Sequence, residues 1–266
     1  MDFFDANYWF DLKNCWLSSD LYTQEEKKAG IDTIKQNLED NDITHSIISS
    51  KLAENYDWDI GNKRLLKSGL TESIENLHYC FALAPDAYFT YDFEDYVSKA
   101  YADKVRLFRV FPKRQIFYVN DYYMKRLYGV LDERRFPVML DFKQLDITGN
   151  KYFDVDVLER ILDENRNMPL ILEATLKQCM FSRFFFPLLE RFENLYIEVG
   201  NLLLYDQIEH YVQKFGSERL VFGSNFPALP AEINTNRIIL ANLSEKDKEN
   251  MAFNNLERII KEIQIG

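Results

Sequence analysis

The sequence is poor in the residues that form disulfides and metal sites. Its 266 residues include three cysteines and three histidines. The three cysteines (Cys15, Cys80 and Cys179) are widely spaced and contain no C-x-x-C pair, which predicts reduced thiols and a cytoplasmic protein. No apolar run approaches the ~20 residues that span a bilayer, and the first residues, Met-Asp-Phe-Phe-Asp, are acidic where a signal peptide is basic. We therefore expect neither a membrane span nor a secretion signal.

Positive charge is also in deficit. The chain has 32 Lys and Arg against 43 Asp and Glu, which gives a formal net charge of −11 and a pI near 4.9. Nucleic acids and anionic membranes bind basic surfaces, so the composition argues against both as partners. A local basic pocket for a small anionic molecule remains compatible with it, and so does a homo-oligomer.

The chain lacks any Gly/Ser linker, charge block or internal repeat that would divide it. Short apolar runs alternate with amphipathic stretches, the pattern of βα units on a parallel sheet. Eight such runs predict strands, at residues 3–6, 46–49, 79–83, 105–110, 138–140, 170–172, 195–199 and 220–222. Together they predict one α/β domain over residues 1–266, a distorted (β/α)8 barrel of TIM type with C-terminal helices.

Helical spacing of apolar residues predicts helices between these strands, at residues 24–39, 121–134, 155–165, 181–192, 206–215 and 244–263. Thr23 and Glu26 form a capping box at the first of them. The polar and aromatic segment 53–76 predicts a long loop over the mouth of the barrel that leads into a helix, or a surface excursion held by Tyr56 and Trp58. We expect the aromatic runs 184–186 and 122–123 to belong to the core.

Four segments resemble one known family. The eighth predicted strand ends in Gly-Ser-Asn-Phe-Pro at 223–227, which is similar to the Gly-Ser/Thr-Asp-aromatic-Pro strand end of the amidohydrolase-related family of metal-dependent hydrolases. Residues 4–9 resemble the Asp-Ala-His-x-His opening of that family. Residues 39–49 resemble its first helix end and second strand, and 243–259 its closing helix pair. The resemblance covers the chain and implies the same barrel.

The family's chemistry uses a metal that histidines and a carboxylate hold and that activates a water molecule. Carried onto this chain, every implied ligand position is substituted, by Asn7, Trp9, Asp141, Asn225 and either Glu173 or Ala174. The three histidines stand at the start of two strands (His45, His78) and inside a helix (His210). We therefore predict no zinc-type centre and no cofactor. A hard cation held by Asp141, Glu173 and Asn225 is the weakest alternative, since oxygen ligands suit such ions.

Residues at the carboxyl ends of barrel strands face the active site. The acidic and amide groups at these ends are Asn7, Asp141, Glu173, Glu198 and Asn225. The basic groups are Lys51, Arg109, Lys113, Arg114, Lys143 and Lys177. Because these cations follow four strands, they predict an anion-binding mouth, unless they are simply solvated. Tyr8, Trp9, Phe142 and Phe226 are candidates for stacking on a ligand, with Trp9 and Phe226 beside the substituted positions.

Asp141 and Glu173 are the candidate catalytic pair, together with Asn225. Two carboxylates on neighbouring strands suit general acid–base chemistry. They are equally suited to ion pairs with Lys143, Lys177 or Arg109 that take the place of the metal. Two functions follow. The first is a hydrolase acting on a sugar acid, lactone or other small carboxylate without zinc. The second is a non-catalytic descendant that binds a small ligand or a protein partner.

Overall fold

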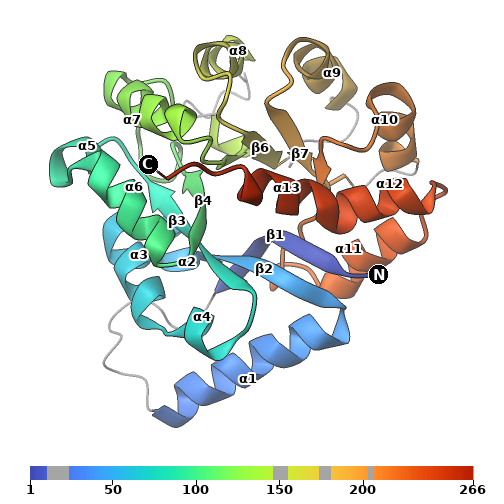
Figure 1. Cartoon of the computed structure of the whole chain (residues 1–266), viewed down its shortest axis with the longest axis horizontal. Coiled ribbons are helices and arrows are strands. Elements are labelled where there is room, and N and C mark those ends of the chain that lie inside the picture. The colour runs from blue at the N-terminus through green and yellow to red at the C-terminus, as the bar shows by residue number, and fades with distance from the viewer. Residues whose placement is uncertain (11–23, 146–154, 174–180, 203–205, 266) are drawn as a thin grey trace.

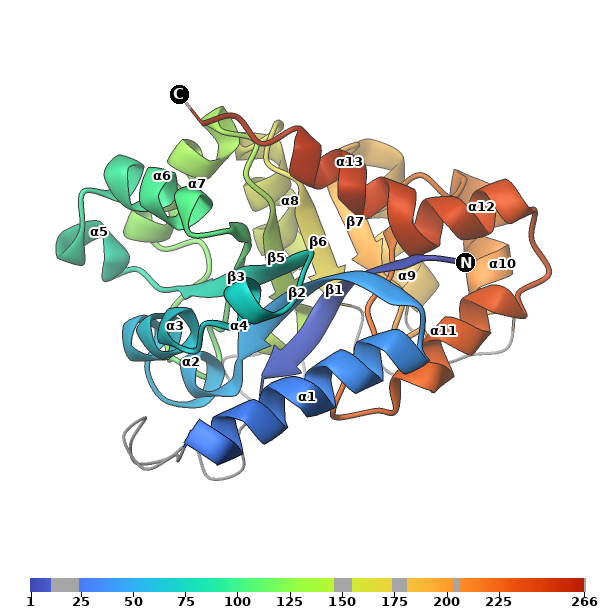
Figure 2. The same cartoon turned by 60° about the horizontal axis from the view of Figure 1, so that its bottom comes forward.

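The computed structural model describes residues 1–10, 24–145, 155–173, 181–202 and 206–265. Within them, parallel strands follow one another in sequence order around a barrel, with helices outside (Figures 1 and 2). The eight strands are β1 (Phe3–Phe10), β2 (Ile43–Ser50), β3 (Leu77–Leu83), β4 (Val105–Val110), β5 (Val138–Asp141), β6 (Leu170–Glu173), β7 (Leu195–Glu198) and β8 (Leu220–Val221). The predicted fold class and all eight predicted strands are confirmed.

Backbone hydrogen bonds close the barrel between its first and last strands. The Ala6 N–H donates to the Phe222 carbonyl (3.0 Å), and the Asn225 N–H donates to the Asn7 carbonyl (2.9 Å). These bonds continue past the end of β8 and join its following residues to β1. The segment that resembles the family's last strand end is therefore fixed against the first strand.

The helices on the outside are α1 (Gln24–Asp40), α5 (Ala87–Thr90), α6 (Phe93–Ala102), α7 (Tyr122–Glu133), α8 (Val155–Glu164), α9 (Phe181–Arg191), α10 (Gln207–Phe215) and α11 (Ala231–Ile239). Five of them, α1 and α7 to α10, agree closely with those predicted from periodicity, whereas α5, α6 and α11 were not predicted. Figure 2 shows α1 lying along β2. Among the described residues, no helix combines the length and apolar character needed to cross a bilayer.

The segment predicted as a long loop that leads into a helix is helical from its start, so the loop part of that prediction was wrong. It contains α2 (Lys51–Asn55), α3 (Trp58–Lys67) and α4 (Leu70–Ser73). Ser50 and Asp57 accept hydrogen bonds from the N–H groups of Ala53 (3.3 Å) and Ile60 (2.7 Å). These N-caps start short helices inside a polar run with little apolar periodicity. Trp58 packs into the core as expected, whereas Tyr56 is 64% exposed.

An apolar cluster fills the barrel interior and its N-terminal end. Its strand residues come from all eight strands: Phe4, Ala6, Ile47, Cys80, Leu107, Met139, Ile171, Tyr196 and Val221. The C-terminal segment crosses this end as α12 (Glu245–Glu249), a π-helical turn (Asn250–Asn254) and α13 (Asn255–Lys261), in red in Figure 1. From it, Leu256 and Ile259 pack onto the cluster. The predicted C-terminal helix is therefore the lid of the N-terminal end.

Two predictions about aromatic and sulfur side chains have mixed outcomes. Phe185 is buried as expected, but Tyr122 is 65% exposed, so its assignment to the core was wrong. Tyr122 contacts Tyr123 on the surface of α7 at 5.2 Å between ring centroids. Cys80 is a free, buried thiol, and burial raises its pKa to about 11. Cys15 and Cys179 lie outside the described residues.

Candidate functional site

Strand register places three carboxylates at one level near the C-terminal end of the barrel. Asp141 on β5 pairs in register with Glu173 on β6, which pairs with Glu198 on β7. Residues two positions earlier on these strands belong to the interior cluster. Because side chains alternate along a strand, the carboxylates also face the interior. On each of these three strands, the last side chain of the interior cluster is therefore followed two residues later by a carboxylate.

On β1 a shift in register turns Asn7 and Trp9 toward this level. The shift lies between Asp5 and Tyr8, where the pairing with β2 is irregular. Asp5 accepts hydrogen bonds from the N–H groups of Asn7 (2.8 Å) and Ser224 (2.9 Å), and so ties β1 to the residues after β8. Burial of Asp5 raises its pKa to about 6, although these hydrogen bonds oppose the rise.

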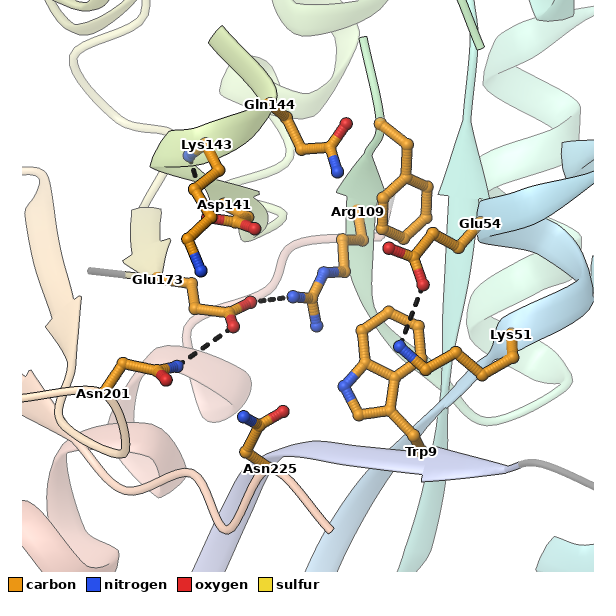
Figure 3. A pocket seen from close by; sticks show the side chains of 11 residues that line it. Trp9, Lys51, Glu54, Arg109, Asp141, Lys143, Gln144, Glu173, Asn201 and Asn225 are labelled. Atoms are coloured by element: carbon orange, nitrogen blue, oxygen red, sulfur yellow. Dashed lines mark hydrogen bonds and ion pairs between the residues drawn. The ribbon is translucent and has the colours of Figure 1, made fainter. Parts of the chain in front are cut away.

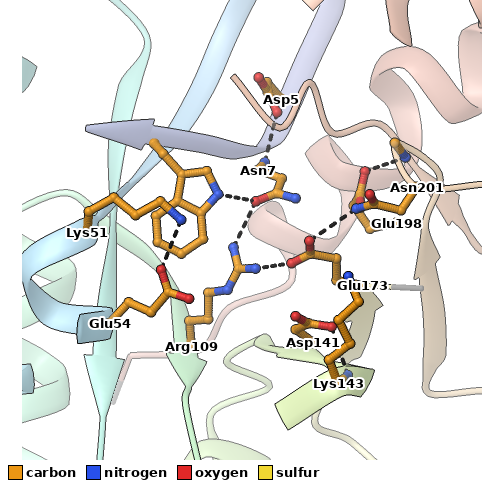
Figure 4. A network of polar contacts seen from close by, with 12 residues as sticks. Asp5, Asn7, Lys51, Glu54, Arg109, Asp141, Lys143, Glu173, Glu198 and Asn201 are labelled. Atoms are coloured by element: carbon orange, nitrogen blue, oxygen red, sulfur yellow. Dashed lines mark hydrogen bonds and ion pairs between the residues drawn. The ribbon is translucent and has the colours of Figure 1, made fainter. Parts of the chain in front are cut away.

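Arg109 is the centre of the polar network at the mouth (Figure 4). Its side chain is 2% exposed. One guanidinium nitrogen, Nη1, donates to Asn7 Oδ1 at 2.8 Å, and Nη2 forms an ion pair with Glu173 Oε2. The indole N–H of Trp9 donates to the same Asn7 oxygen at 2.9 Å. The other Glu173 oxygen accepts from Asn201 Nδ2 at 3.1 Å. The guanidinium is thus held between β1 and β6.

Burial and charge act in opposite directions on this pair. Burial raises the pKa of Glu173, and the guanidinium of Arg109 opposes that rise. Burial also lowers the pKa of Arg109, but Glu173 and, to a smaller extent, Cys80, Glu54 and Asp141 together outweigh burial, so the pKa ends above its ordinary value. An arginine side chain stays charged in proteins. The mouth therefore contains a permanent buried cation whose counter-ion is Glu173.

Glu198 lies behind this pair and is fully buried. Its Oε1 accepts a hydrogen bond from the Gly200 N–H, and its Oε2 has no partner among the described residues. Burial, reinforced by the nearby Glu173 carboxylate, raises the pKa of Glu198 well above its ordinary value. The side chain packs against Gly223, where an added Cβ would lie 2.2 Å from Glu198 Oε1. Glu198 is therefore a fully buried, tightly enclosed carboxyl group behind the pocket.

A pocket of about 160 Å³ opens above Arg109 (Figure 3). Its lining is mostly polar and comprises Trp9, Lys51, Glu54, Arg109, Phe111, Asp141, Lys143, Gln144, Glu173, Asn201 and Asn225. Three of these residues are cationic (Lys51, Arg109, Lys143) and three are carboxylates (Glu54, Asp141, Glu173). Three of the six predicted cations therefore line the pocket, and among the described lining residues carboxylates match them in number.

Trp9 forms one wall and contacts two of the cations. Lys51 Nζ lies 3.5 Å from the centroid of its ring, and Arg109 Cζ lies 4.4 Å from it. Cation–π contacts of this kind fix a cation over an aromatic face. The Lys51 ammonium is also 2.9 Å from Glu54 Oε2. The indole therefore orients a lysine and an arginine at the same edge of the pocket.

The predicted site residues divide into three groups. Those that line the pocket are Trp9, Arg109, Asp141, Lys143, Glu173 and Asn225. Asn225 has φ +57°, a left-handed conformation that asparagine tolerates, and its side chain points into the pocket. Asn7 lies behind Trp9 and Arg109 and holds both.

The other predicted residues lie elsewhere. Phe226 stacks on the buried Tyr8 at 5.1 Å and does not line the pocket, and neither does the exposed Lys113. Phe142 is fully buried. Lys177 and Ala174 lie outside the described residues, and the sixth-strand position stays with either Glu173, which faces the site, or Ala174. His45 packs on Phe253 at the N-terminal end, as its sequence position predicted.

Sequence reasoning missed four lining residues: Glu54, Phe111, Gln144 and Asn201. Glu54 was missed because residues 53–76 were predicted to begin as a loop. In the structure Glu54 belongs to α2, where it lies one helical turn from Lys51. Phe111 directly follows β4 and Asn201 lies three residues after the end of β7, so the rule that strand ends face the site would have found them. Gln144 accepts a hydrogen bond from the Arg114 N–H at 3.1 Å, a contact without a sequence pattern.

The side chains at the mouth do not fit the family's metal. Zinc is bound by histidine, cysteinate and carboxylate groups. Among the described residues, no three or more such side chains are grouped to hold an ion. At the implied positions on β1 and β6, Asn7 and Glu173 contact the guanidinium of Arg109. Both oxygens of Glu173 have protein partners. The guanidinium of Arg109 therefore contacts two residues at implied ligand positions, Asn7 and Glu173.

No protein-family model matches the chain, and no curated protein sequence does. Solved structures do match its fold. A proposed amidohydrolase from Staphylococcus aureus has a TM-score of 0.72 at 12% identity, over 98% of this chain and 100% of the other. The manganese-bound 5-carboxyvanillate decarboxylase of Novosphingobium aromaticivorans has a TM-score of 0.71 at 10% identity, over 98% and 97% of the two chains.

A third structure is a probable 2-pyrone-4,6-dicarboxylic acid hydrolase from Acinetobacter baumannii with citric acid bound. Its TM-score is 0.66 at 13% identity, over 98% of this chain and 100% of the other. Identities this low show a shared barrel fold across the full length of the chain. They agree with the fold that the sequence resemblance implied.

Proposed function

We propose that this chain is an amidohydrolase-like barrel protein that binds a small carboxylate at the mouth and works without a zinc-type centre. The observation that carries the proposal is the position of Arg109. Its guanidinium is buried in the middle of the mouth, between Asn7 and Glu173, where the family resemblance implies metal ligands. A fixed cation there can supply the charge that a metal would otherwise offer to an anionic ligand.

The chemistry of the pocket supports a carboxylate. A guanidinium presents five N–H donors in a planar fork that matches a carboxylate. Two of its nitrogens are oriented by Asn7 and Glu173, so the fork is already in place. Lys51, held over Trp9, adds an ammonium at the same edge. Two of the similar structures carry names of enzymes of carboxylates, the carboxyvanillate decarboxylase and the pyrone dicarboxylic acid hydrolase.

The size of the pocket limits the ligand. An enclosed cavity of ~150 Å³ in another protein accepts a benzene-sized molecule. At about 160 Å³, the present pocket suits a ligand of similar size, such as a short-chain acid, a small sugar acid or its lactone.

For hydrolysis, Asp141 is the candidate general base. Its half-buried carboxylate lies at the pocket wall opposite Lys51 (Figure 3). In this reaction Asp141 takes a proton from a water molecule as the water oxygen attacks a lactone carbonyl. The N–H groups of Arg109 and the Lys51 ammonium then stabilise the negative charge that develops on the carbonyl oxygen. The intermediate collapses as the ring C–O bond breaks, and the leaving oxygen takes the proton from Asp141, which gives the open hydroxy acid and restores the Asp141 carboxylate.

One observation favours the second candidate, binding without turnover. Glu173, the predicted partner of Asp141, has both oxygens engaged and is buried beside Arg109. A carboxylate in this arrangement neutralises the cation and is poorly placed to exchange protons with a substrate. The predicted acid–base pair is thereby reduced to Asp141. Carboxylate binding is common to both candidates.

A ligand screen tests the proposal. Short-chain acids, sugar acids and citrate should raise the thermal midpoint of the wild type, whereas the matching primary amides should not. Lys51→Met should weaken the effect, because it removes a cation from the pocket edge. A screen in which no carboxylate shifts the midpoint would remove the proposal. If the wild type hydrolyses lactones and Asp141→Asn does not, the protein is a hydrolase. If no lactone is turned over, the protein binds carboxylates without catalysis.

A further inference from the structure

The two aromatic side chains of the pocket lining present little ring surface to a ligand. Trp9 and Phe111 are 4% and 2% exposed. Lys51 Nζ lies 3.5 Å from the centroid of the Trp9 ring, and Arg109 Cζ lies 4.4 Å from it. Arg109 Cζ also lies 5.6 Å from the centroid of the Phe111 ring. These rings therefore contact cations of the protein, and neither is an open platform for an aromatic ligand.

Three amide side chains line the pocket, and each follows a different strand. Gln144 lies in the 3₁₀ turn Phe142–Leu145 after β5, Asn201 follows β7, and Asn225 follows β8. A side-chain amide carries two N–H donors and an acceptor oxygen. These residues can therefore hydrogen-bond to an uncharged polar group of a ligand.

Contacts within the protein orient two of these amides. Asn201 Nδ2 donates to Glu173 Oε1 at 3.1 Å, so the amide oxygen of Asn201 remains to accept from a ligand. Gln144 Oε1 accepts from the Arg114 N–H at 3.1 Å, so the NH₂ group of Gln144 remains to donate. The pocket thus offers an oriented acceptor after β7 and an oriented donor after β5.

Asn225 offers both functions at once. Its backbone is fixed, because its N–H donates to the Asn7 carbonyl at 2.9 Å and its own carbonyl accepts from the Leu229 N–H at 3.1 Å. Its side chain points into the pocket, and in Figure 3 no hydrogen bond joins its amide to the other lining residues. A ligand group that both donates and accepts would satisfy this amide.

The charged side chains of the lining favour an uncharged partner for these amides. Cations and carboxylates lie beside one another in three places: Lys51 with Glu54, Arg109 with Glu173, and Lys143 next to Asp141. A second charged group on a carboxylate ligand would therefore lie close to a charge of its own sign wherever it was placed. A hydroxyl group adds no charge, and it both donates and accepts hydrogen bonds.

We infer that the pocket takes a small aliphatic hydroxy acid. Its carboxylate lies against Arg109, and its hydroxyl groups hydrogen-bond to the amides of Asn225, Asn201 and Gln144. This inference rests on the proposed function, since it assumes that the mouth binds a carboxylate. It adds the nature of the rest of the ligand, a hydroxylated chain in place of an apolar chain or an aromatic ring, and it makes Asn225 the residue that selects this chain.

Matched ligands test the inference on the unmodified protein. Calorimetric titration compares propanoate, 2-hydroxypropanoate, 2,3-dihydroxypropanoate and benzoate, with both enantiomers of the chiral acids. The first three share one carbon chain and one charge and differ only in hydroxyl groups. Because the hydroxyl groups add hydrogen bonds, the dihydroxy acid should bind about tenfold more tightly than propanoate, with the monohydroxy acid between them. Benzoate should bind no more tightly than propanoate.

A glycine variant tests the role of Asn225. Asn225→Gly removes the amide, and glycine tolerates the positive φ of this position. The variant should reduce the advantage of the dihydroxy acid over propanoate to about threefold or less. The matched control is Asn76→Gly, because Asn76 also has a positive φ of +55°, is exposed and directly precedes β3 at the opposite end of the barrel. This control should keep the wild-type ratio.

The failures of the two proposals look different. If propanoate binds as tightly as the hydroxy acids, or benzoate binds more tightly than they do, the hydroxy acid inference is overturned and carboxylate binding stands. If none of the four acids binds, the proposed function fails with it. Equal ratios in Asn225→Gly and Asn76→Gly would overturn the role of Asn225. If Asn225→Gly does not fold, the comparison of ligands on the wild type decides the ligand class alone.

Discussion

The two ends of this barrel are built from the same strands but hold opposite kinds of side chain. At the N-terminal end, Leu256 and Ile259 of α13 seal an apolar cluster. At the C-terminal end, Arg109, Glu173 and Asn7 form a buried polar network. On β6 the change from Ile171 to Glu173 takes two residues. The N-terminal end is therefore a conventional apolar core, whereas the C-terminal end contains buried charges.

This contrast distinguishes side chains that stabilise the fold from side chains that serve a function. Apolar burial stabilises the fold directly. Taking two charges out of water is costly, and a buried ion pair often contributes less than an apolar replacement of the same volume. A chain that needed only a closed barrel could fill both ends with apolar side chains. The charged end is therefore best explained by what it binds.

The largest effect should follow the loss of one partner of the buried pair. Arg109→Met leaves Glu173 buried without its counter-ion, and we expect a loss of about 4 kcal/mol in the free energy of unfolding. Urea denaturation at neutral pH measures it. Adding Glu173→Met should recover most of the loss, because both charges are then gone.

The control for this variant is an exposed pair. Arg135 contacts Glu262 at 2.7 Å with both side chains more than a third exposed, so Arg135→Met should cost less than about 1 kcal/mol. Equal losses in the two arginine variants would show that the network at the mouth is no different from a surface ion pair.

At the apolar end, Leu256→Ala should cost about 3 kcal/mol, because it opens a cavity in a buried cluster. Carboxylate affinity should stay the same, since the pocket lies at the opposite end. Denaturation and ligand titration on the same sample check both statements. A loss of affinity beyond the loss of folded protein would mean that the two ends are coupled.

Asp5 should make stability depend on pH. Its pKa is about 6 in the folded chain against 3.8 for an ordinary aspartate, so the folded state binds more protons between these values. Stability should therefore fall as pH rises from about 4 to about 6, by at most about 3 kcal/mol from this group. Asp5→Asn retains an acceptor for the Asn7 and Ser224 N–H groups and should lack this contribution. Parallel denaturation curves at pH 4.5 and 7 measure the difference, and an unchanged difference between the two proteins would refute it.

The smallest effect should come from placing an aspartate, the residue of the similar family motif, at the end of the eighth strand. Asn225→Asp keeps the left-handed backbone, which aspartate also tolerates, and should change stability by less than about 1 kcal/mol. It should not create a metal site, because Arg109 still contacts Asn7 and Glu173. Metal analysis of the purified variant is the check, and one zinc per chain would contradict the expectation.

The sequence was sufficient for the barrel because apolar runs and helix periodicity are local signals. Each of the predicted strands recurs in the structure, and Asn225 and Asp141 do mark the mouth. The helices between 51 and 73 were missed because their caps, Ser50 and Asp57, lie inside a polar run. Tyr122 was misplaced because aromatic residues at helical spacing do not reveal which side of the helix faces solvent.

The network itself could not be derived from sequence. Arg109 and Asn7 are 102 residues apart, and Arg109 and Glu173 are 64 apart. Charge counting predicted cations at the mouth, of which Lys51, Arg109 and Lys143 line the pocket, but it could not show that Lys51 and Arg109 would each contact a carboxylate. The irregular pairing between Asp5 and Tyr8, which turns Asn7 inward, also has no sequence pattern. Pairings of this kind depend on the closed barrel.

The most direct test of the central claim is the metal content of the protein purified without chelator. If the guanidinium of Arg109 takes the place of the metal, zinc and manganese should each be well below one ion per chain, and carboxylates should still raise the thermal midpoint of that same sample. One tightly bound zinc or manganese per chain, lost in Glu173→Ala, would contradict the account.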